Sequence, residues 1–170
     1  VSFYNETDGI PIYPTPTIGM VGLLPKVNRV ITPWFKAAGD IVVLLGRTRE
    51  ELGGSEYLKL IHNTVKGTPP WIDLKLEQAI QTCCIEAIES GILRSAHDIS
   101  DGGLAVALAE CCIGGPDKAL GVRAEMREMI RGDALLFSES QSRILVSRQE
   151  KDLGQLQEIA SRHAVPLQVI

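Results

Sequence analysis

The sequence is poor in aromatic residues and has no excess of positive charge. Phe, Trp and Tyr make up 5% of the 170 residues, and the formal net charge is −4 at pH 7. Nucleic-acid-binding proteins usually carry a basic patch, so we expect no nucleic-acid partner. The longest apolar runs, such as 41–46, are far shorter than the roughly 20 residues of a transmembrane helix, so we expect no membrane association.

Cysteine is scarce and is not spaced for metal binding. The four cysteines form two adjacent pairs, at 83–84 and 111–112, and both pairs lie inside apolar helical patterns. Zinc knuckles separate their paired cysteines by two residues, so these pairs do not match. We expect buried, reduced thiols, which are typical of a cytoplasmic protein.

What the sequence does contain is a succession of apolar segments and polar turns from residue 39 onwards. Residues 41–46 are apolar on both faces and predict a central strand. Strands are expected at 41–46, 92–96, 119–124 and 143–147, and helices at 56–65, 74–90, 104–113, 125–131 and 151–164. Asp73 is the expected N-cap of the second helix and Gly91 its C′ residue, whereas 133–137 fits a helix or a strand. The alternation predicts an α+β fold of mixed α/β layers.

Residues 1–38 lack a pattern that would bury a core of their own. Their β-prone runs at 1–4 and 18–24 are separated by a turn cluster at 5–9 and by Pro14 and Pro16, which exclude a helix. We interpret 1–38 as the tail of a preceding domain. Residues 39–170 are then a second domain, which we expect to be truncated at its C-terminus because 166–170 resembles the start of a strand with no following partner.

The densest group of polar residues lies at 97–103, directly before an apolar helix. This group consists of His97, Asp98, Ser100, Asp101 and the pair Gly102-Gly103. Either Ser100 or Asp101 can cap the helix. Polar groups beside a glycine turn at a helix start are also a candidate anion or phosphate site. Taken alone, the residues favour a cap, a turn and a buried helix.

Two pairs within this group could carry chemistry. His97 with Asp98 has the composition of a general base and its orienting carboxylate. Neighbours on a strand point to opposite faces, so a half-buried histidine at a strand end is the favoured interpretation. Asp98 and Asp101 can face one phosphate-bound Mg²⁺, which needs only one or two protein carboxylates. Bracing of the turn is an equally good interpretation of these two aspartates.

Two further loops are weaker candidates. Glu139, Ser140 and Gln141 place a carboxylate, a hydroxyl and an amide in one short loop, which suits a hydroxylated small molecule. An ordinary solvated loop is favoured on composition alone. Gly53-Gly54-Ser55 lacks the lysine that a phosphate-binding loop requires.

These segments together match, in order, the motifs of one enzyme family. The chain resembles the synthetase subunit of phosphoribosylformylglycinamidine synthase, the PurL family. The matching segments are VSFYNET (1–7), IYPTPTIG (12–19), GD (39–40), ELGGSEY (51–57), AHDISDGGL (96–104) and LFSESQ (136–141). The IYPTPTIG and HDISDGG segments are similar to the second half of that subunit.

The resemblance implies a fold of the aminoimidazole ribonucleotide synthetase superfamily. Residues 1–38 would end an N-type domain, and 39–170 would form most of a C-type domain. The family's reaction converts formylglycinamide ribonucleotide, glutamine and ATP to formylglycinamidine ribonucleotide in purine biosynthesis, with Mg²⁺ neutralising the phosphates. The implied partners are the remainder of the subunit, a glutaminase subunit and a small bridging subunit. Superfamily kinases for thiamine phosphate or selenide are a third alternative that the motifs disfavour.

The resemblance assigns few site residues and no catalytic residue to this chain. Ser2 matches a substrate-contacting position, whereas the family's catalytic histidine belongs to the first half, so His97 does not inherit that role. The Glu139–Gln141 loop matches the second-half counterpart of a substrate loop, and Ser142 stands where many members have glycine. The implied auxiliary nucleotide or phosphate site contains His97, Asp98, Asp101, Gly102, Gly103, Glu139, Ser140 and Gln141. The alternative is an assembly module, inactive alone, that packs against the catalytic half and the glutaminase without a ligand site.

Overall fold

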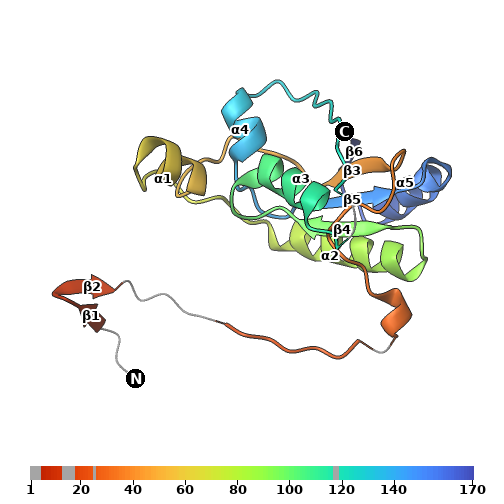
Figure 1. Cartoon of the computed structure of the whole chain (residues 1–170), viewed down its shortest axis with the longest axis horizontal. Helices are drawn as coiled ribbons and strands as arrows, with labels where there is room; N and C mark the ends of the chain where they lie inside the picture. The colour runs from red at the N-terminus through yellow and green to blue at the C-terminus, as the bar shows by residue number, and fades with distance from the viewer. Residues whose placement is uncertain (1–4, 13–17, 25, 117–118) are drawn as a thin grey trace.

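The computed structural model describes residues 5–12, 18–24, 26–116 and 119–170. The expected strand at 1–4, with Ser2, lies outside the described residues, as do Pro14 and Pro16. The main body of the molecule is a sheet covered by helices on both faces (Figure 1). Within the described residues, no helix is long and apolar enough to cross a bilayer.

The sheet has four antiparallel strands in the order β4-β5-β3-β6. Their bounds are β3 Ile41–Leu45, β4 Ser95–Asp98, β5 Ile144–Arg148 and β6 Leu167–Val169. The apolar run at 41–46 is confirmed as a central strand, because β3 pairs with β5 on one side and β6 on the other. The strand expected near the end of the chain is β6, and its partner is β3.

Two hydrophobic clusters lie on opposite faces of this sheet. Val43 and Leu45 of β3 face a cluster with α2 (Leu74–Glu89) and α5 (Leu153–Arg162). Val42 and Leu44, which alternate with them, face a second cluster with α3 (Gly103–Ile113). Side chains on a strand alternate between faces, so a strand buried on both sides must be apolar at every position. This layered arrangement confirms the predicted α+β class.

The helix signals in the sequence act as expected at α2. Asp73 is the N-cap, and its carboxylate accepts hydrogen bonds from the N–H groups of Lys75 and Leu76. Gly91 follows the helix with φ +74°, a left-handed conformation that favours glycine at C′. A 3-10 turn at Glu150–Asp152 leads into α5, and α1 covers Glu56–His62.

Three predicted elements are wrong in place or kind. The strand expected at 92–96 begins three residues later, because Ile92 and Leu93 are buried in the turn after α2. Residues 119–131 form neither the predicted strand nor the predicted helix. Leu120 donates one backbone bond to Cys112, and no ladder with a strand is formed by the described part of this segment. The ambiguous 133–137 segment is helical, as α4 at Gly132–Phe137.

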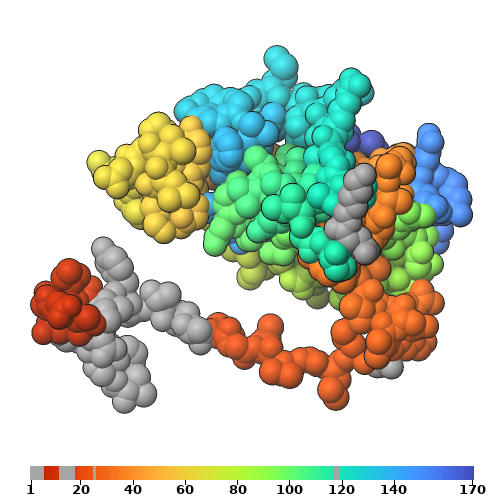
Figure 2. All heavy atoms as spheres, in the orientation of Figure 1, coloured from red at the N-terminus to blue at the C-terminus, as the bar shows by residue number. Residues whose placement is uncertain are grey.

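The N-terminal part extends away from the main body (Figures 1 and 2). The turn predicted at 5–9 is wrong for its first three residues, because Asn5–Thr7 form strand β1, which pairs with β2 (Ile10–Ile12). Asp8 and Gly9 form the turn with φ values of 53° and 75°, as a two-residue hairpin requires. Residues 18–24 form no strand, and a short 3-10 helix covers Val27–Arg29.

Candidate functional site

Three loops identified in the sequence meet at one edge of the sheet. Both β3 and β4 run antiparallel to β5, so the ends of β3 and β4 lie beside the start of β5. Ile144, the first residue of β5, pairs with Leu45 on one side and with Asp98 on the other. The loops after β3 and β4 and the loop before β5 are therefore neighbours, on the side of the molecule where α1 and α4 lie (Figure 1).

Glu139 connects all three loops. Its Oε1 accepts a hydrogen bond from the backbone N of Glu56, at 2.9 Å, and another from the backbone N of Gly102, also at 2.9 Å. Glu56 is the first residue of α1 and Gly102 is the N-cap of α3. A carboxylate is favourable at a helix start because the first N–H groups there lack helical partners. One oxygen thus serves two helix starts, and we call Glu56, Gly102 and Glu139 the Glu139 junction.

The predicted capping of α3 by Ser100 or Asp101 is wrong. Both residues are exposed. The N-cap is Gly102, which has no side chain to cap the helix. Gly102 and Gly103 have φ values of 77° and 70°, so the chain turns through two left-handed residues before the helix begins. A Cβ on Gly103 would lie 2.5 Å from the carbonyl oxygen of Ser138, so only glycine fits this approach.

Arg143 holds the loop that carries Glu139. Its guanidinium donates to the carbonyls of Ser138, at 2.6 Å, and Ser140, at 2.9 Å, and to the hydroxyl of Thr48, at 3.1 Å. The hydroxyl of Ser140 accepts from the backbone N of Arg49 and donates to its carbonyl, at 3.1 and 3.3 Å. The loop is therefore bonded to the segment after β3 and is not the freely solvated loop that composition favours.

Sequence reasoning missed Arg143. The residue is 2% exposed, and burial lowers the pKa of its guanidinium to about 10, while the charges of Glu51 and Glu139 raise it. The group stays protonated at neutral pH. The available signal was a single arginine at the start of an otherwise apolar strand, because a charge at a buried position needs hydrogen-bonding partners.

His97 does not face the Glu139 junction. Its Nε2 lies 3.0 Å from Oε2 of Glu110, and its Nδ1 lies 2.6 Å from the carbonyl oxygen of Asp98. Glu110 is eight residues beyond Gly102, which is about 12 Å along the axis of α3. The expected half-buried histidine at a strand end is confirmed, with 14% of the side chain exposed. Asp98 also lies beside the ring, with its Oδ1 3.5 Å from Nδ1.

The remaining candidates are exposed. Asp98 has 78% of its side chain exposed, and Asp101 and Gln141 are also at the surface. Gln141 donates from Nε2 to the carbonyl of Glu139, at 3.2 Å. Among the described residues, no group of three or more His, Cys, Asp or Glu side chains could hold a metal ion. Two surface carboxylates therefore fit a Mg²⁺ only when nucleotide phosphates complete its ligand set. Ser2 lies outside the described residues.

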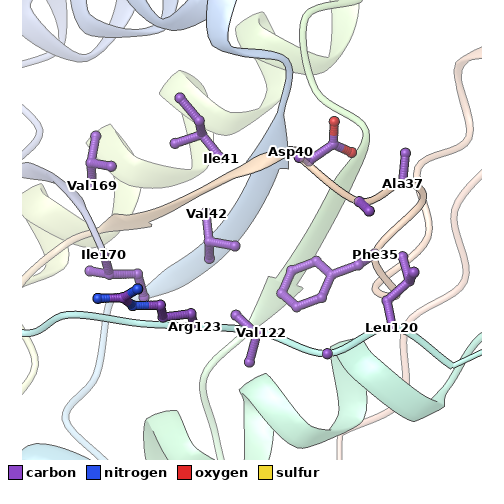
Figure 3. Close-up of a pocket in the computed structure, with 13 residues that line it drawn as sticks. Phe35, Ala37, Asp40, Ile41, Val42, Leu120, Val122, Arg123, Val169 and Ile170 are labelled. Carbon is purple, nitrogen blue, oxygen red and sulfur yellow. The ribbon is translucent and has the colours of Figure 1, made fainter.

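The cavity shown in Figure 3 is separate from these residues. It has a volume of about 370 Å³ and lies between the start of β3, the segment 120–123 and the end of β6. The side chains of Phe35, Val42 and Val122 converge on it. The Glu139 junction lies beyond the opposite end of β3, so none of the predicted site residues lines this cavity.

The cysteines are free thiols and most of them are buried, as predicted. All four are free, and three are buried. Burial raises the pKa of the Cys83 and Cys84 thiols to about 11 and that of Cys111 to about 12. Such thiols remain protonated at neutral pH, so they pack as small apolar groups and are poor nucleophiles.

The sequence of this chain matches the model of one protein family. The model described as "AIR synthase related protein, C-terminal domain" matches residues 37–170. The chain belongs to this family. The AIR synthase C-terminal domain therefore includes the whole sheet and the Glu139 junction.

Several curated relatives of this chain are PurL subunits. The phosphoribosylformylglycinamidine synthase subunit PurL of Symbiobacterium thermophilum is 46% identical over 171 residues, which is 100% of this chain and 22% of the relative. The same subunit of Moorella thermoacetica is 46% identical over 170 residues, 100% of this chain and 23% of the relative. The chain thus spans less than a quarter of the length of these relatives.

Solved structures share the fold. "T. maritima PurL complexed with FGAR" has a TM-score of 0.69 at 21% identity, over 84% of this chain and 25% of that chain. "T. maritima PurL complexed with ATP" has a TM-score of 0.61 at 21% identity, over 84% of this chain and 23% of that chain. "Structure of PurLQS from Thermotoga maritima" has a TM-score of 0.60 at 20% identity, over 85% of this chain and 23% of that chain.

Proposed function

We propose that this chain is part of a PurL-type synthetase, the ATP-dependent ligase that forms formylglycinamidine ribonucleotide. The observation that carries the proposal is 46% identity to a PurL subunit over 100% of this chain. The catalytic residues lie outside these 170 residues, so the chain alone is inactive. Its setting is the cytoplasm, in agreement with four free cysteines.

Within this protein, residues 1–38 form the tail of an N-type domain and 39–170 most of a C-type domain. The support is the exposed apolar run at 18–24. Val21 is 100% exposed and Leu23 97% exposed, and apolar side chains in one run are normally covered by a partner surface. We infer that this run completes a sheet of the preceding domain, because its β-prone sequence forms no strand within the described residues.

The C-type domain contributes an auxiliary nucleotide site at the start of α3. The loops before α1 and α3 and the Glu139–Gln141 loop converge there. Ser2 would contact substrate elsewhere in the protein. Asp98 and Asp101 would hold a Mg²⁺ that arrives with the nucleotide. A PurL of T. maritima has been solved with ATP and with ADP, which supports a nucleotide as the ligand class.

The second candidate function is an assembly module without a ligand. One observation favours it: the Glu139 carboxylate, a group of the chain itself, already accepts a hydrogen bond from one backbone N–H at the start of α1 and one at the start of α3. In this case the domain packs against the catalytic half, the glutaminase and a small bridging subunit. A related complex, PurLQS, has been solved from T. maritima.

Calorimetric titration of the protein made from its complete gene separates the two functions. We expect the variant D98N/D101N to lose at least one class of Mg·ADP sites, because the carboxylates that would hold its metal are neutralised. The matched control is E150Q/E158Q, which removes two exposed carboxylates elsewhere. An unchanged number and affinity of sites in D98N/D101N contradicts the auxiliary site and favours the assembly module.

A further inference from the structure

We propose that the sheet edge at β6 is the seat of one further β-strand, supplied by a part of the complete polypeptide that lies outside these 170 residues. The cavity in Figure 3 is then a surface for contact with protein and not a pocket for a small molecule. The proposal rests on the proposed function only in placing this chain within a longer protein. The chain spans less than a quarter of its curated relatives, so a protein of that length contains other segments that can pair with this edge.

The backbone of β6 is paired on one side only. Ile170 donates a hydrogen bond to the carbonyl of Val42 in β3, at 3.1 Å. Alternate residues of an antiparallel strand direct their N–H and C=O groups to opposite sides. Leu167 and Val169 therefore direct theirs to the outer side, where no strand lies among the described residues. An edge of this kind is a template for one more strand.

The extended segment 119–131 runs beside this edge. Its half-buried residues include 124, 126, 128 and 130, and the residues between these four are exposed. A period of two is typical of a strand with one covered face, although this segment forms no ladder with any described strand. A side-chain hydrogen bond from Nε2 of Gln168 to Oε2 of Glu128, at 3.3 Å, joins the segment to β6. The segment thus lies alongside β6 without pairing with it.

Three cavities occupy the space between β6 and this segment. The first is the cavity of about 370 Å³ in Figure 3, and the other two have volumes of about 210 and 380 Å³. All three are lined by residues of 166–170 on one side and by residues of 120–128 on the other. Each is many times larger than the roughly 30 Å³ share of one water molecule. The gap therefore follows the whole length of β6.

The wall of the first cavity is mostly apolar. The side chains of Phe35, Val42 and Val122 converge on it (Figure 3). Contact of apolar surface with water is unfavourable, so the group that fills this space brings an apolar side chain of its own. A strand of the sheet does so at every second position.

The two charged residues of this wall already have partners. Asp40 forms an ion pair with Arg94, at 3.3 Å, and Arg123 forms one with Glu125, at 2.6 Å. A small-molecule pocket usually adds a few converging polar groups to its apolar wall. The outward backbone groups of β6 are the polar groups that remain, and they match a polypeptide that binds through its main chain.

Amide hydrogen exchange in the protein made from its complete gene tests the pairing. We expect the amides of Leu167 and Val169 to exchange roughly a hundredfold or more slowly than unprotected amides, because both donate to the added strand. The amide of Val43 in the central strand is the protected reference. Fast exchange at Leu167 and Val169 overturns the proposal. Protection that disappears on dilution also overturns it, because the strand then comes from a second copy.

Photo-cross-linking in the same protein identifies the source of the strand. Benzoylphenylalanine replaces Arg123, which lines the first cavity with 86% of its side chain exposed, or, as the control, the fully exposed Met129 of the same segment. We expect the label at 123, and not the control, to capture a peptide from outside residues 1–170. Capture of β6 alone means that 119–131 closes on β6 itself, and this result, or no capture, overturns the proposal. Neither test measures ligase activity, so its failure leaves the proposed function standing.

Discussion

Two buried arginines lie at the two ends of β5: Arg143 directly precedes the strand, and Arg148 is its last residue. Arg143 donates three bonds, whereas Nε and Nη1 of the fully buried Arg148 find no partner among the described residues. We expect R143M to destabilise the fold by about 3 kcal/mol, since buried acceptors lose their donor. R148M should be neutral or stabilising by about 1–2 kcal/mol, because a buried charge is removed whose one hydrogen bond, from Nη2 to the carbonyl of Gln149, leaves Nε and Nη1 unsatisfied.

Urea unfolding of the two variants, followed by circular dichroism, checks this difference. Methionine replaces an unbranched side chain in both cases, so each variant is the control for the other. Equal losses of stability would show that Nε and Nη1 of Arg148 find hydrogen-bond partners in solution, and would contradict the expected difference.

Ser142 is the second residue whose environment predicts a measurable effect. Its φ is 61°, and its buried hydroxyl has no partner within the described chain. A left-handed backbone costs a non-glycine residue roughly 1–2 kcal/mol. We expect S142G to raise the free energy of unfolding by about 1 kcal/mol, which thermal unfolding can measure. S142A keeps the backbone strain, so an equal gain in S142A would assign the effect to the hydroxyl instead.

At the scale of elements, an ion cluster joins the end of α5 to α2. Glu86 accepts from His163, at 2.7 Å, and from Arg162. These bonds, that of His163 first, lower the pKa of the Glu86 carboxyl below its usual 4.5. The unfolded state therefore takes up a proton before the folded state as the pH falls. The stability from this cluster is present above the unfolded pKa and is lost as pH falls through the folded pKa.

The measurement is the urea midpoint at a series of values from about pH 6 to pH 3, for the unmodified chain and for E86Q. We expect the difference between the urea midpoints of the unmodified chain and E86Q to be constant near neutral pH and to shrink in the acid range. Parallel curves throughout would contradict a folded-state effect of Glu86. The comparison removes the contribution of other carboxylates, such as Asp133, since they titrate in both proteins.

Elements with a strong apolar pattern could be predicted from the sequence, and those decided by distant contacts could not. The central strand and α2 follow from unbroken apolar spacing and from local caps such as Asp73. Residues 119–124 have the same local character as a strand but find no ladder partner within the described residues. The Glu139 junction was unpredictable for the same reason, because Glu139 lies 83 residues from Glu56 and 37 from Gly102.

At the scale of the whole molecule, the exposed apolar run at 18–24, called the arm below, should control self-association. Ile18, Met20, Val21 and Leu23 are each more than four-fifths exposed, and Figure 2 shows the arm standing away from the main body. Contiguous apolar surface of this kind is normally covered in a soluble protein. We therefore expect the 170-residue chain, expressed alone, to form concentration-dependent oligomers in analytical ultracentrifugation.

The variant M20S/V21S/L23S isolates the arm as the cause. These side chains are at least 92% exposed, so their replacement leaves both hydrophobic clusters of the main body intact. We expect this variant to sediment as a monomer with an unchanged circular dichroism spectrum. Oligomers that persist would point to another surface, such as the exposed Ile85 face of α2. A monomeric unmodified chain would mean that the arm folds back on its own domain, which would contradict the assignment of residues 1–38 to a neighbouring one.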